Sequence, residues 1–353
     1  TALACAQAGF TVALIDRATP DAMTEPEEDG RASALGFASG EAFRALGVWE
    51  DLGAQAQPIE RITVTDGDAP GGLRYDGADL TWPDGQPRPL GYIAENRHIR
   101  LALHAGVARA PRITGVYPAT IAPNGLTVDV DRAALRLVDG RVLRARLIAA
   151  CDGRGSMIRR LAGGRSRVKS YGQTAIVCAV AHDRDHEGVA HERFLPHGPF
   201  AMLPMTPSAA HPHRSSLVWT ERGRTAGAFT DLSDHAFGRE LERRFGPWLG
   251  ALHPIGPRFA YPLSLMTVDR LTFPRIALIG DSGHGMHPIA GQGFNLGLRD
   301  AAILAETAAE SARIGLDPGG AEALAAYAAW RRVDIATMLG VTDAINFLFS
   351  NDI

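Results

Sequence analysis

Glycines alternate with polar side chains between positions 280 and 295, which makes this stretch the best candidate for a ligand site. It reads Gly-Asp-Ser-Gly-His-Gly-Met-His-Pro-Ile-Ala-Gly-Gln-Gly-Phe-Asn. Glycines allow a backbone to lie against a ligand, or to turn where other residues cannot. The chemistry that such a stretch supports is binding through backbone N–H groups, with acids and histidines beside them.

The residues on either side predict the elements that position this stretch. Residues 276–279 form an apolar run of the length expected for a buried parallel strand. Leu298, Ala302 and Ala305 follow at helical spacing. The chain therefore predicts a strand, a glycine-rich loop and the N-terminus of a helix. The unpaired N–H groups and positive dipole end of that terminus favour an anionic group, or one that becomes anionic during a reaction.

Two further predicted strands end in acids. Residues 11–15 predict a buried parallel strand that ends in Asp16, where a Rossmann unit places the acid that hydrogen-bonds a ribose hydroxyl. On this interpretation, a first strand and a glycine-rich turn are expected ahead of Thr1. Residues 147–150 predict a strand that ends in Asp152, ahead of the helix-capping Ser156. For both acids a turn or helix cap is the alternative.

The rest of the chain changes character twice, from mixed helices and strands to a strand-rich region and then to helices. Short β-branched and aromatic runs between positions 166 and 265 predict an antiparallel sheet. The other predicted elements are helices at 39–46, 95–104, 237–245, 321–339 and 342–349, a strand pair at 62–65 and 73–75, and a meander at 113–150 with turns at Asn124-Gly125 and Asp139-Gly140.

The glycine-rich stretch also carries a family resemblance. Gly-Asp-x-x-His, then His-Pro-x-x-Gly-Gln-Gly-x-Asn-x-Gly-x-x-Asp, resembles the second FAD-binding motif of the flavoprotein aromatic hydroxylases, which share the p-hydroxybenzoate hydroxylase fold. Within that superfamily it is most similar to the ubiquinone-biosynthesis hydroxylases. The sequence departs from the usual family form at Ser282-Gly283, where Ala-Ala is common.

The resemblance implies an α/β fold: a Rossmann-like FAD-binding domain with an inserted antiparallel-sheet substrate domain and C-terminal helices. The FAD-binding domain would be discontinuous and comprise residues 1–60, 90–165 and 266–353. The substrate domain would comprise residues 61–89 and 166–265. The first strand and the G-x-G-x-x-G turn of the FAD-binding domain are not part of this sequence.

The resemblance also implies roles for particular residues. Without it, Arg31 is interpreted as a surface salt-bridge residue and Arg97 as a solvated helix charge. The residues expected to bind FAD are Asp16, Arg31, Arg97, Asp152, Gly280, Asp281, Pro288, Gly291, Gly293, Phe294 and Asn295. No catalytic base is identified, and the candidates beside the flavin are His287, Pro288, Gly291, Gln292 and Gly293.

The reaction implied by the resemblance is hydroxylation of an aromatic ring. NAD(P)H would reduce FAD, O2 would bind at C4a of the reduced flavin, and the resulting hydroperoxide would transfer an oxygen atom to the ring of a polyprenylated phenol or quinone precursor of ubiquinone. Two alternatives are kept open. One is a hydroxylase of the same fold that acts on a soluble aromatic or polyketide substrate, and the other is a non-catalytic scaffold in a quinone-biosynthesis complex.

Composition excludes several other classes of protein. The formal net charge of -3 argues against a nucleic-acid-binding protein. Cys5, Cys151 and Cys178 have no metal-binding spacing and suggest a reducing compartment. No apolar run reaches the roughly 18 residues of a membrane-spanning helix. We therefore expect a cytoplasmic protein without a metal site. The resemblance leaves open a peripheral contact with the inner membrane, and homo-oligomerisation is also left open.

Overall fold

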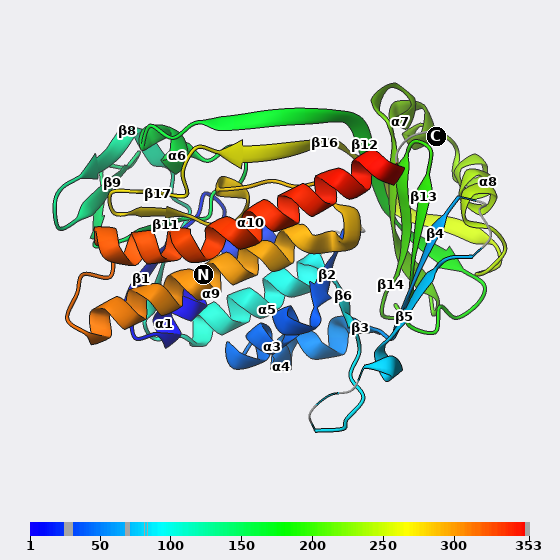
Figure 1. Ribbon diagram of the computed structural model, residues 1–353, viewed down its shortest axis with the longest axis horizontal. Helices are drawn as coiled ribbons and strands as arrows, with labels where there is room; N and C mark the ends of the chain where they lie inside the picture. The colour runs from blue at the N-terminus through cyan, green and yellow to red at the C-terminus, as the bar shows by residue number, and fades with distance from the viewer. Residues whose placement is uncertain (25–30, 68–70, 81, 83, 350–353) are drawn as a thin grey trace.

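The computed structural model describes residues 1–24, 31–67, 71–80, 82 and 84–349. Figure 1 shows an α/β part on the left, which includes the long helices α9 (Gln292–Arg313) and α10 (Ala321–Phe349), and a sheet-rich part on the right. The long strands β12 (Ser166–His182) and β16 (Leu252–Val268) run along the top of this view from one part to the other. The predicted α/β fold class is confirmed.

Parallel strands form the centre of the α/β part. The pairs are β1 (Val12–Ile15) with β7 (Ile113–Val116), and β11 (Ile148–Ala150) with β18 (Ile276–Leu278). Every residue of β18 is buried, as its apolar run predicts. The prediction that residues 11–15 form a buried strand is correct for the strand but wrong for its burial. β1 is only partly buried because, among the described residues, it pairs with β7 alone.

Helices cover these strands, and the predicted ones near positions 39–46 and 95–104 are confirmed. The first helix ends where Gly9 takes a φ of +95°, a backbone conformation that favours glycine. The helices are α1 (Ala2–Gln7), α2 (Pro20–Thr24), α3 (Phe37–Ala45), α4 (Trp49–Leu52), α5 (Asn96–Arg109) and α6 (Met157–Leu161). Two small antiparallel strands, β2 (Ala32–Gly36) and β3 (Ala56–Ile59), flank β6 (Gly91–Glu95), and β17 (Thr272–Phe273) pairs with β18.

The predicted meander is present as β8 (Ile121–Val128), β9 (Ala133–Leu137) and β10 (Val142–Ala145). The predicted turn at Asn124-Gly125 is wrong, because β8 runs through it. Asn124 has a φ of 54°, and the register with β9 shifts between Ile121 and Leu126. A left-handed residue of this kind forms a bulge, which bends a strand without ending it.

Strands from two distant segments of the chain form the large sheet. Its order is β16-β12-β15-β14-β13-β4-β5. The additional strands are β4 (Arg61–Asp66), β5 (Leu73–Asp76), β13 (Val189–Leu195), β14 (Gly198–Pro204) and β15 (Arg214–Arg222). The antiparallel sheet predicted between positions 166 and 265 is confirmed, because every strand pair within it is antiparallel. β4, from outside that range, joins β13 in the parallel direction. No hairpin joins these two strands, so their relative direction is free to be parallel.

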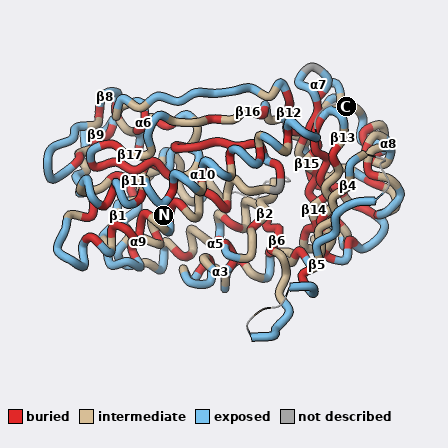
Figure 2. Tube along the Cα trace, viewed as in Figure 1, coloured by how far each residue is buried: buried red, intermediate tan, exposed pale blue. Residues whose placement is uncertain are grey.

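One face of this sheet packs against α7 (Gly223–Thr230) and α8 (Asp234–Phe245), and we call it the outer face. The buried interior appears red along β14 and β15 in Figure 2. Side chains that are almost completely buried in this core include Ile176, Phe200, Leu217, Trp219, Phe237 and Phe245. The opposite face, which we call the inner face, is turned toward the α/β part.

The C-terminal region contains one long helix where the sequence predicts two. α10 continues through Gly340, so the predicted break between residues 339 and 342 is wrong. One glycine in a helix costs only about 1 kcal/mol. Leu339, Thr342 and Asn346 are buried on both sides of it and offset that cost. In the described part of the chain, no helix has the length and apolar character needed to cross a membrane, and no group of His, Cys, Asp and Glu side chains could hold a metal ion.

Candidate functional site

The glycine-rich loop begins where β18 ends, and an acid on α9 holds it in place. The Gly280 N–H donates a hydrogen bond to Asp300 Oδ2 at 2.8 Å. Gly280 has a φ of +59°. A Cβ on Gly297 of α9 would lie 3.3 Å from the Gly280 Cα, tighter than most such contacts. Both glycines are therefore needed for the strand end and the helix to approach each other this closely.

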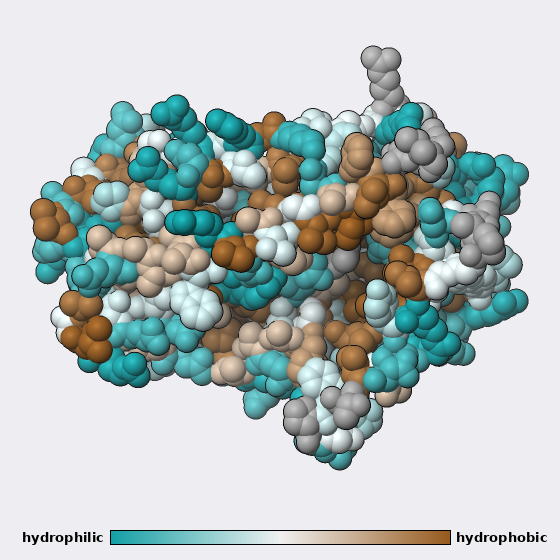
Figure 3. Space-filling model, viewed as in Figure 1, coloured by the Kyte–Doolittle hydropathy of each residue, from teal (hydrophilic) through white to brown (hydrophobic). Residues whose placement is uncertain are grey.

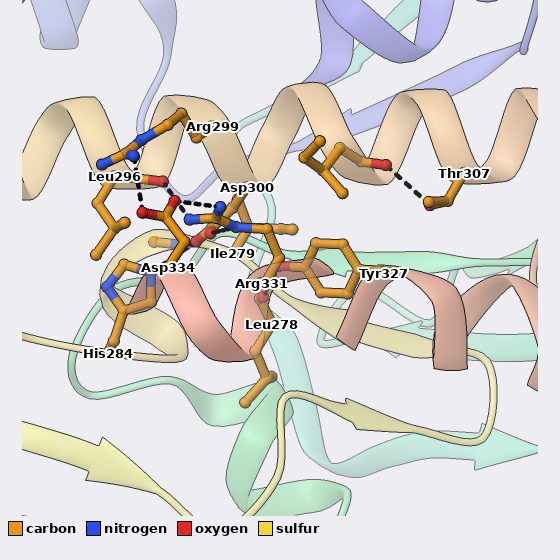
Figure 4. Close-up of polar contacts among 12 residues, drawn as sticks. Leu278, Ile279, His284, Leu296, Arg299, Asp300, Thr307, Tyr327, Arg331 and Asp334 are labelled. Carbon is orange, nitrogen blue, oxygen red and sulfur yellow. Dashed lines mark hydrogen bonds and ion pairs between the residues drawn. The ribbon is translucent and has the colours of Figure 1, made fainter. Parts of the chain in front are cut away.

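Asp300 is the centre of a buried ion-pair network behind the loop (Figure 4). Its Oδ2 lies 2.7 Å from His284 Nε2, and its Oδ1 accepts a hydrogen bond from Arg331 Nε at 2.6 Å. Arg331 also bonds Asp334 at 2.5 Å, and Asp334 extends the network to Arg299 at 2.8 Å. The network ties the loop, α9 and α10 together, so the loop is held on a rigid support.

The second half of the loop leads into α9 through Gly291. This residue has a φ of +62°, and no side chain caps the helix. A Cβ at Gly291 would lie 2.7 Å from the Ala34 Cβ, so only glycine fits without movement of β2. The uncapped first turn leaves backbone N–H groups available to an electron-rich edge of a bound molecule.

Asn295 fixes this helix start against β2. Its Oδ1 accepts hydrogen bonds from the Gly36 N–H at 2.9 Å and the Ser39 hydroxyl at 2.6 Å. Its Nδ2 donates to the Ala34 carbonyl at 2.9 Å. The Asn295 side chain is thus occupied by the protein, so a direct contact with a cofactor is left to its backbone. The neighbouring Phe294 packs edge-on against Phe43 in the core, with ring centroids 6.1 Å apart.

His287 is fully buried beneath the loop. Its Nδ1 accepts a hydrogen bond from the Ile289 N–H at 3.3 Å, whereas its Nε2 has no partner among the residues that the structure describes. Burial lowers the pKa of His287 to about 4. Its ring lies edge-on to Tyr171 of β12, with centroids 5.1 Å apart. The loop therefore meets the large sheet at this histidine.

The three predicted acids lie at strand ends. Asp281 has a side chain that is 55% exposed, and its Oδ2 lies 3.6 Å from Arg154 Nε. Asp152 Oδ2 accepts hydrogen bonds from the first N–H groups of α6, at 2.6 and 3.1 Å. Asp16 Oδ1 accepts one from the Ala18 N–H at 3.0 Å. In both Asp16 and Asp152, one carboxylate oxygen therefore caps a turn or a helix, as the alternative interpretation predicts. The other oxygen remains available to a ligand.

The two predicted arginines lie where the α/β part meets the large sheet. Arg97 Nε donates to Glu95 Oε2 at 3.0 Å, and its side chain is only 20% exposed, so it is not a solvated helix charge. Glu95 also forms a buried ion pair with Arg214 of β15, which the sequence did not reveal. The guanidinium carbon of Arg31 lies 6.0 Å from the centre of the Phe259 ring.

The described residues fit FAD on structural grounds. Backbone glycines allow close approach at two turns, carboxylates stand at three strand ends, and a long helix presents an uncapped N-terminus. When bound, FAD supplies the redox chemistry and the activation of O2. The chain's own residues would bind the cofactor, orient it and exclude water from its reactive side. The individual contacts expected with FAD stay predictions.

Sequence reasoning missed the Asp300–Arg331 pair, although a signal was present. Asp300 lies on the buried stripe of α9 between Leu296 and Leu304, each four positions away. Arg331 interrupts the buried stripe of α10, which also contains Leu324, Tyr327, Ile335 and Leu339. Opposite charges on the apolar stripes of two neighbouring helices predict a buried pair.

Comparisons with known proteins agree with this geometry. A family model described as "FAD binding domain" matches residues 1–338. Ubiquinone hydroxylase UbiL of Rhodospirillum rubrum is 46% identical over 353 residues, which cover 99% of this chain and 79% of that protein. The 3-demethoxyubiquinol 3-hydroxylase of Escherichia coli is 30% identical over 339 residues, 96% of this chain and 82% of that protein.

Solved structures share the fold at lower identity. Pseudomonas aeruginosa PqsL in complex with 2-aminobenzoylacetate has a TM-score of 0.80 at 20% identity, over 99% of this chain and 93% of that one. The p-nitrophenol 4-monooxygenase PnpA of Pseudomonas putida has a TM-score of 0.77 at 18% identity, over 100% and 86%. The predicted resemblance is therefore confirmed, and this chain belongs to the FAD-dependent aromatic hydroxylases, in the family of the ubiquinone-biosynthesis hydroxylases.

Proposed function

We propose that this protein is an FAD-dependent monooxygenase that hydroxylates an aromatic ring of a polyprenylated ubiquinone precursor, with NAD(P)H as electron donor and O2 as oxidant. One observation carries the proposal: a relative named ubiquinone hydroxylase is 46% identical over 99% of the chain. The glycine-rich loop, its network around Asp300 and the uncapped start of α9 support it, since they provide a rigid cradle for the cofactor.

The proposed division of labour follows the two parts of the fold. Residues 1–60, 90–165 and 266–353 would hold FAD, and residues 61–89 and 166–265 would hold the substrate. Pairing of β4 with β13 supports the assignment of β4 and β5 to the substrate domain, because it joins them to the sheet formed by residues 166–268. The inner face of that sheet would form one wall of the substrate site.

The test is an anaerobic reduction followed by a substrate assay. The purified protein, reconstituted with FAD, should show a flavin spectrum that bleaches with NADPH or NADH and returns with air. It should then hydroxylate a short-chain prenylated phenol, with consumption of NAD(P)H and O2. A protein that holds no FAD would instead support a scaffold. A flavoprotein that hydroxylates only unprenylated aromatic or polyketide substrates would overturn the ubiquinone assignment.

We further propose that the molecule contacts a membrane surface through the end of α10. Large apolar side chains are exposed there: Val341 is 48% exposed, Phe347 78% and Leu348 63%. Figure 3 shows apolar side chains, in brown, along this helix. A prenylated substrate partitions into lipid, so an apolar surface close to its site would favour its transfer.

Sedimentation with liposomes tests the membrane contact. The protein should pellet with vesicles of anionic and zwitterionic phospholipids, and the double substitution Phe347→Ser and Leu348→Ser should reduce the bound fraction severalfold. Val130, which is 93% exposed in the turn between β8 and β9, offers a control through Val130→Ser. Equal binding by all three proteins would contradict the proposed surface.

A further inference from the structure

We propose that Glu192 is the group that binds the ring hydroxyl of the phenolic substrate and accepts its proton. The proposal rests on the hydroxylase function above, because a phenol becomes a better oxygen acceptor when it loses its proton. No group on the glycine-rich loop fills this role: His287 is buried and Asp281 lies on the exposed side of the loop beside Arg154.

Alternation along β13 sets the direction in which Glu192 points. Its two neighbours contact the outer face: the His191 ring lies 5.2 Å from the Phe245 ring, and Arg193 Nη1 donates to the Phe245 carbonyl at 3.0 Å. Successive side chains of a strand point to opposite faces of the sheet. Glu192 therefore belongs to the inner face, away from α8.

The residues two positions away show what this face meets. Ala190 packs in a cluster with Ile59 of β3 and Ile93 of β6. Phe194 stacks on Phe349 of α10, with ring centroids 4.6 Å apart. Glu192 lies between these two contacts on the same face, so its carboxylate is directed toward the region between the small β2–β6–β3 sheet and the end of α10.

The glycine-rich loop reaches the same space from the other side. Ala34 of β2 belongs to the cluster that contains Ala190, and it is the residue that a Cβ at Gly291 would strike at 2.7 Å. Farther along the sheet, Tyr171 of β12 contacts His287 of the same loop. The inner face and the glycine-rich loop are thus two walls of one site.

The surroundings of Glu192 suit an aromatic ring with an apolar tail. Register places Val64 and Ala201 directly beside it on the neighbouring strands, with Val218 and Val177 beyond Ala201. The next row of the inner face is also mainly apolar, with Ile62, Ala190, Leu203, Ser216 and Ala179. A flat ring with a prenyl tail would bury these side chains.

Other charged groups of the inner face lie away from Glu192 or have partners. Arg214 is paired with Glu95. Asp66 is exposed at the end of β4. Other titratable groups of this face are Arg222 at the far end of β15, the exposed Tyr75 on the edge strand β5, and His253 and Tyr261 on the edge strand β16. No hydrogen bond or ion pair holds the Glu192 carboxylate within the described part of the chain, and burial alone raises its pKa to about 7.

The proposed step transfers one proton from the phenol to the Glu192 carboxylate. The phenol O–H bond breaks and leaves its electron pair on the phenol oxygen, and a new O–H bond forms on a Glu192 oxygen. The products are a phenolate and a neutral carboxylic acid, so charge is conserved. A base whose pKa lies close to the working pH is effective in such a step and contributes roughly 10²- to 10⁴-fold in rate.

The test compares the FAD-loaded wild type with Glu192→Gln. Gln keeps the size of the side chain but accepts no proton. Binding of a short-chain prenylated phenol, followed through the change in the flavin spectrum, should tighten in the wild type as pH rises from 6 to 8 and should not change with pH in the variant. Hydroxylation in a single turnover should fall roughly 10²-fold or more in the variant, while reduction of FAD by NAD(P)H stays the same.

Glu187→Gln is the matched control, because Glu187 precedes the same strand with a side chain 72% exposed and paired with Arg61. It should behave as the wild type. Glu192→Asp should retain the pH dependence of binding at a lower rate of hydroxylation. If Glu192→Gln keeps the wild-type pH dependence and rate, Glu192 is not the base. If the wild type hydroxylates no prenylated phenol although Glu192→Gln removes the pH dependence of phenol binding, the assigned substrate is wrong but the role of Glu192 stands.

Discussion

The two walls of the site differ in how their polar groups are satisfied. Behind the glycine-rich loop, Asp300 accepts hydrogen bonds from a backbone N–H, a histidine and an arginine. On the inner face of the large sheet, Glu192 has no partner in the described residues and has a raised pKa. Buried polar groups cost free energy unless they are paired. The hydrogen bonds of Asp300 keep the glycine-rich loop rigid, whereas the unpaired Glu192 carboxylate can bind a substrate that enters and leaves.

The difference follows from what each wall must hold. A tightly bound cofactor needs a surface that keeps one geometry, and a network shared by three elements provides it. A substrate must enter, lose a proton and leave, so the group that meets it cannot already be occupied by the protein. Changes on the two walls should therefore have different effects: loss of folding and FAD on one, and altered pH dependence on the other.

The largest loss in the free energy of unfolding is expected for Asp300→Asn. The change removes the charge that Arg331 and His284 share, and breaking a buried pair typically costs about 3–5 kcal/mol. Urea unfolding should show a loss of this size, and the purified protein should contain much less FAD. Asp334→Asn is the control, because Asp334 lies at the partly exposed edge of the same network and should cost about 1 kcal/mol or less. Equal losses in both variants would argue against a central role for Asp300.

Gly291→Ala should act mainly on FAD. The new methyl group would meet Ala34, and alanine resists the left-handed backbone of Gly291, so the two effects together cost about 2–4 kcal/mol. We expect FAD affinity, measured by fluorescence titration, to fall by at least tenfold. Gly227→Ala on the exposed side of α7 has open space and should leave FAD affinity unchanged. Normal FAD affinity in Gly291→Ala would mean that β2 can move away from the loop.

His287 should make stability depend on pH at the acidic end. Its pKa is about 4 in the folded protein, below the ordinary value of 6.5, so the unfolded chain binds the proton more readily. The free energy of unfolding should fall by about 2–3 kcal/mol as pH drops from 6.5 to 4. His287→Asn should remove this share of the loss, and His235→Asn, at an exposed position on α8, should not. Parallel pH profiles of wild type and His287→Asn would show that the imidazole is not buried neutral.

The wall formed by the glycine-rich loop was largely predictable, because the sequence patterns that indicate it are local. Glycines, a preceding apolar strand and a following helical pattern occupy one stretch of sequence, so the strand, the loop and the start of α9 could be predicted from it. The apolar stripes of α9 and α10 mark Asp300 and Arg331 as buried opposite charges, but the contact between the two helices, 31 positions apart at this pair, depends on tertiary packing. The continuous α10 was missed for a similar reason: the packing around Gly340 outweighs its poor helix propensity.

The inner face of the large sheet was less predictable. The strands were expected, but the face that each residue occupies depends on the order of strands in the sheet and on its bulges. The parallel pairing of β4 with β13 and the register shifts between β12 and β16 are examples. Glu192 lies between His191 and Arg193 in the sequence, and only the contacts of those two residues with Phe245 show that Glu192 points the other way.

The smallest effect on the free energy of unfolding is expected for Glu192→Gln. The pH dependence that Glu192 gives to stability has the opposite sign to that of His287. The folded pKa of Glu192, about 7, lies above the ordinary 4.5, so its contribution to stability is fully present below pH 4.5 and is lost as pH rises through 7. Since the side chain is only partly buried, this loss should be about 1–2 kcal/mol. Urea unfolding should therefore find Glu192→Gln more stable than the wild type at pH 8 and equal to it at pH 4.5, with Glu187→Gln unchanged at both. A variant less stable than the wild type at pH 8 would mean that the carboxylate has a stabilising partner, and the two walls would then not differ in the way described.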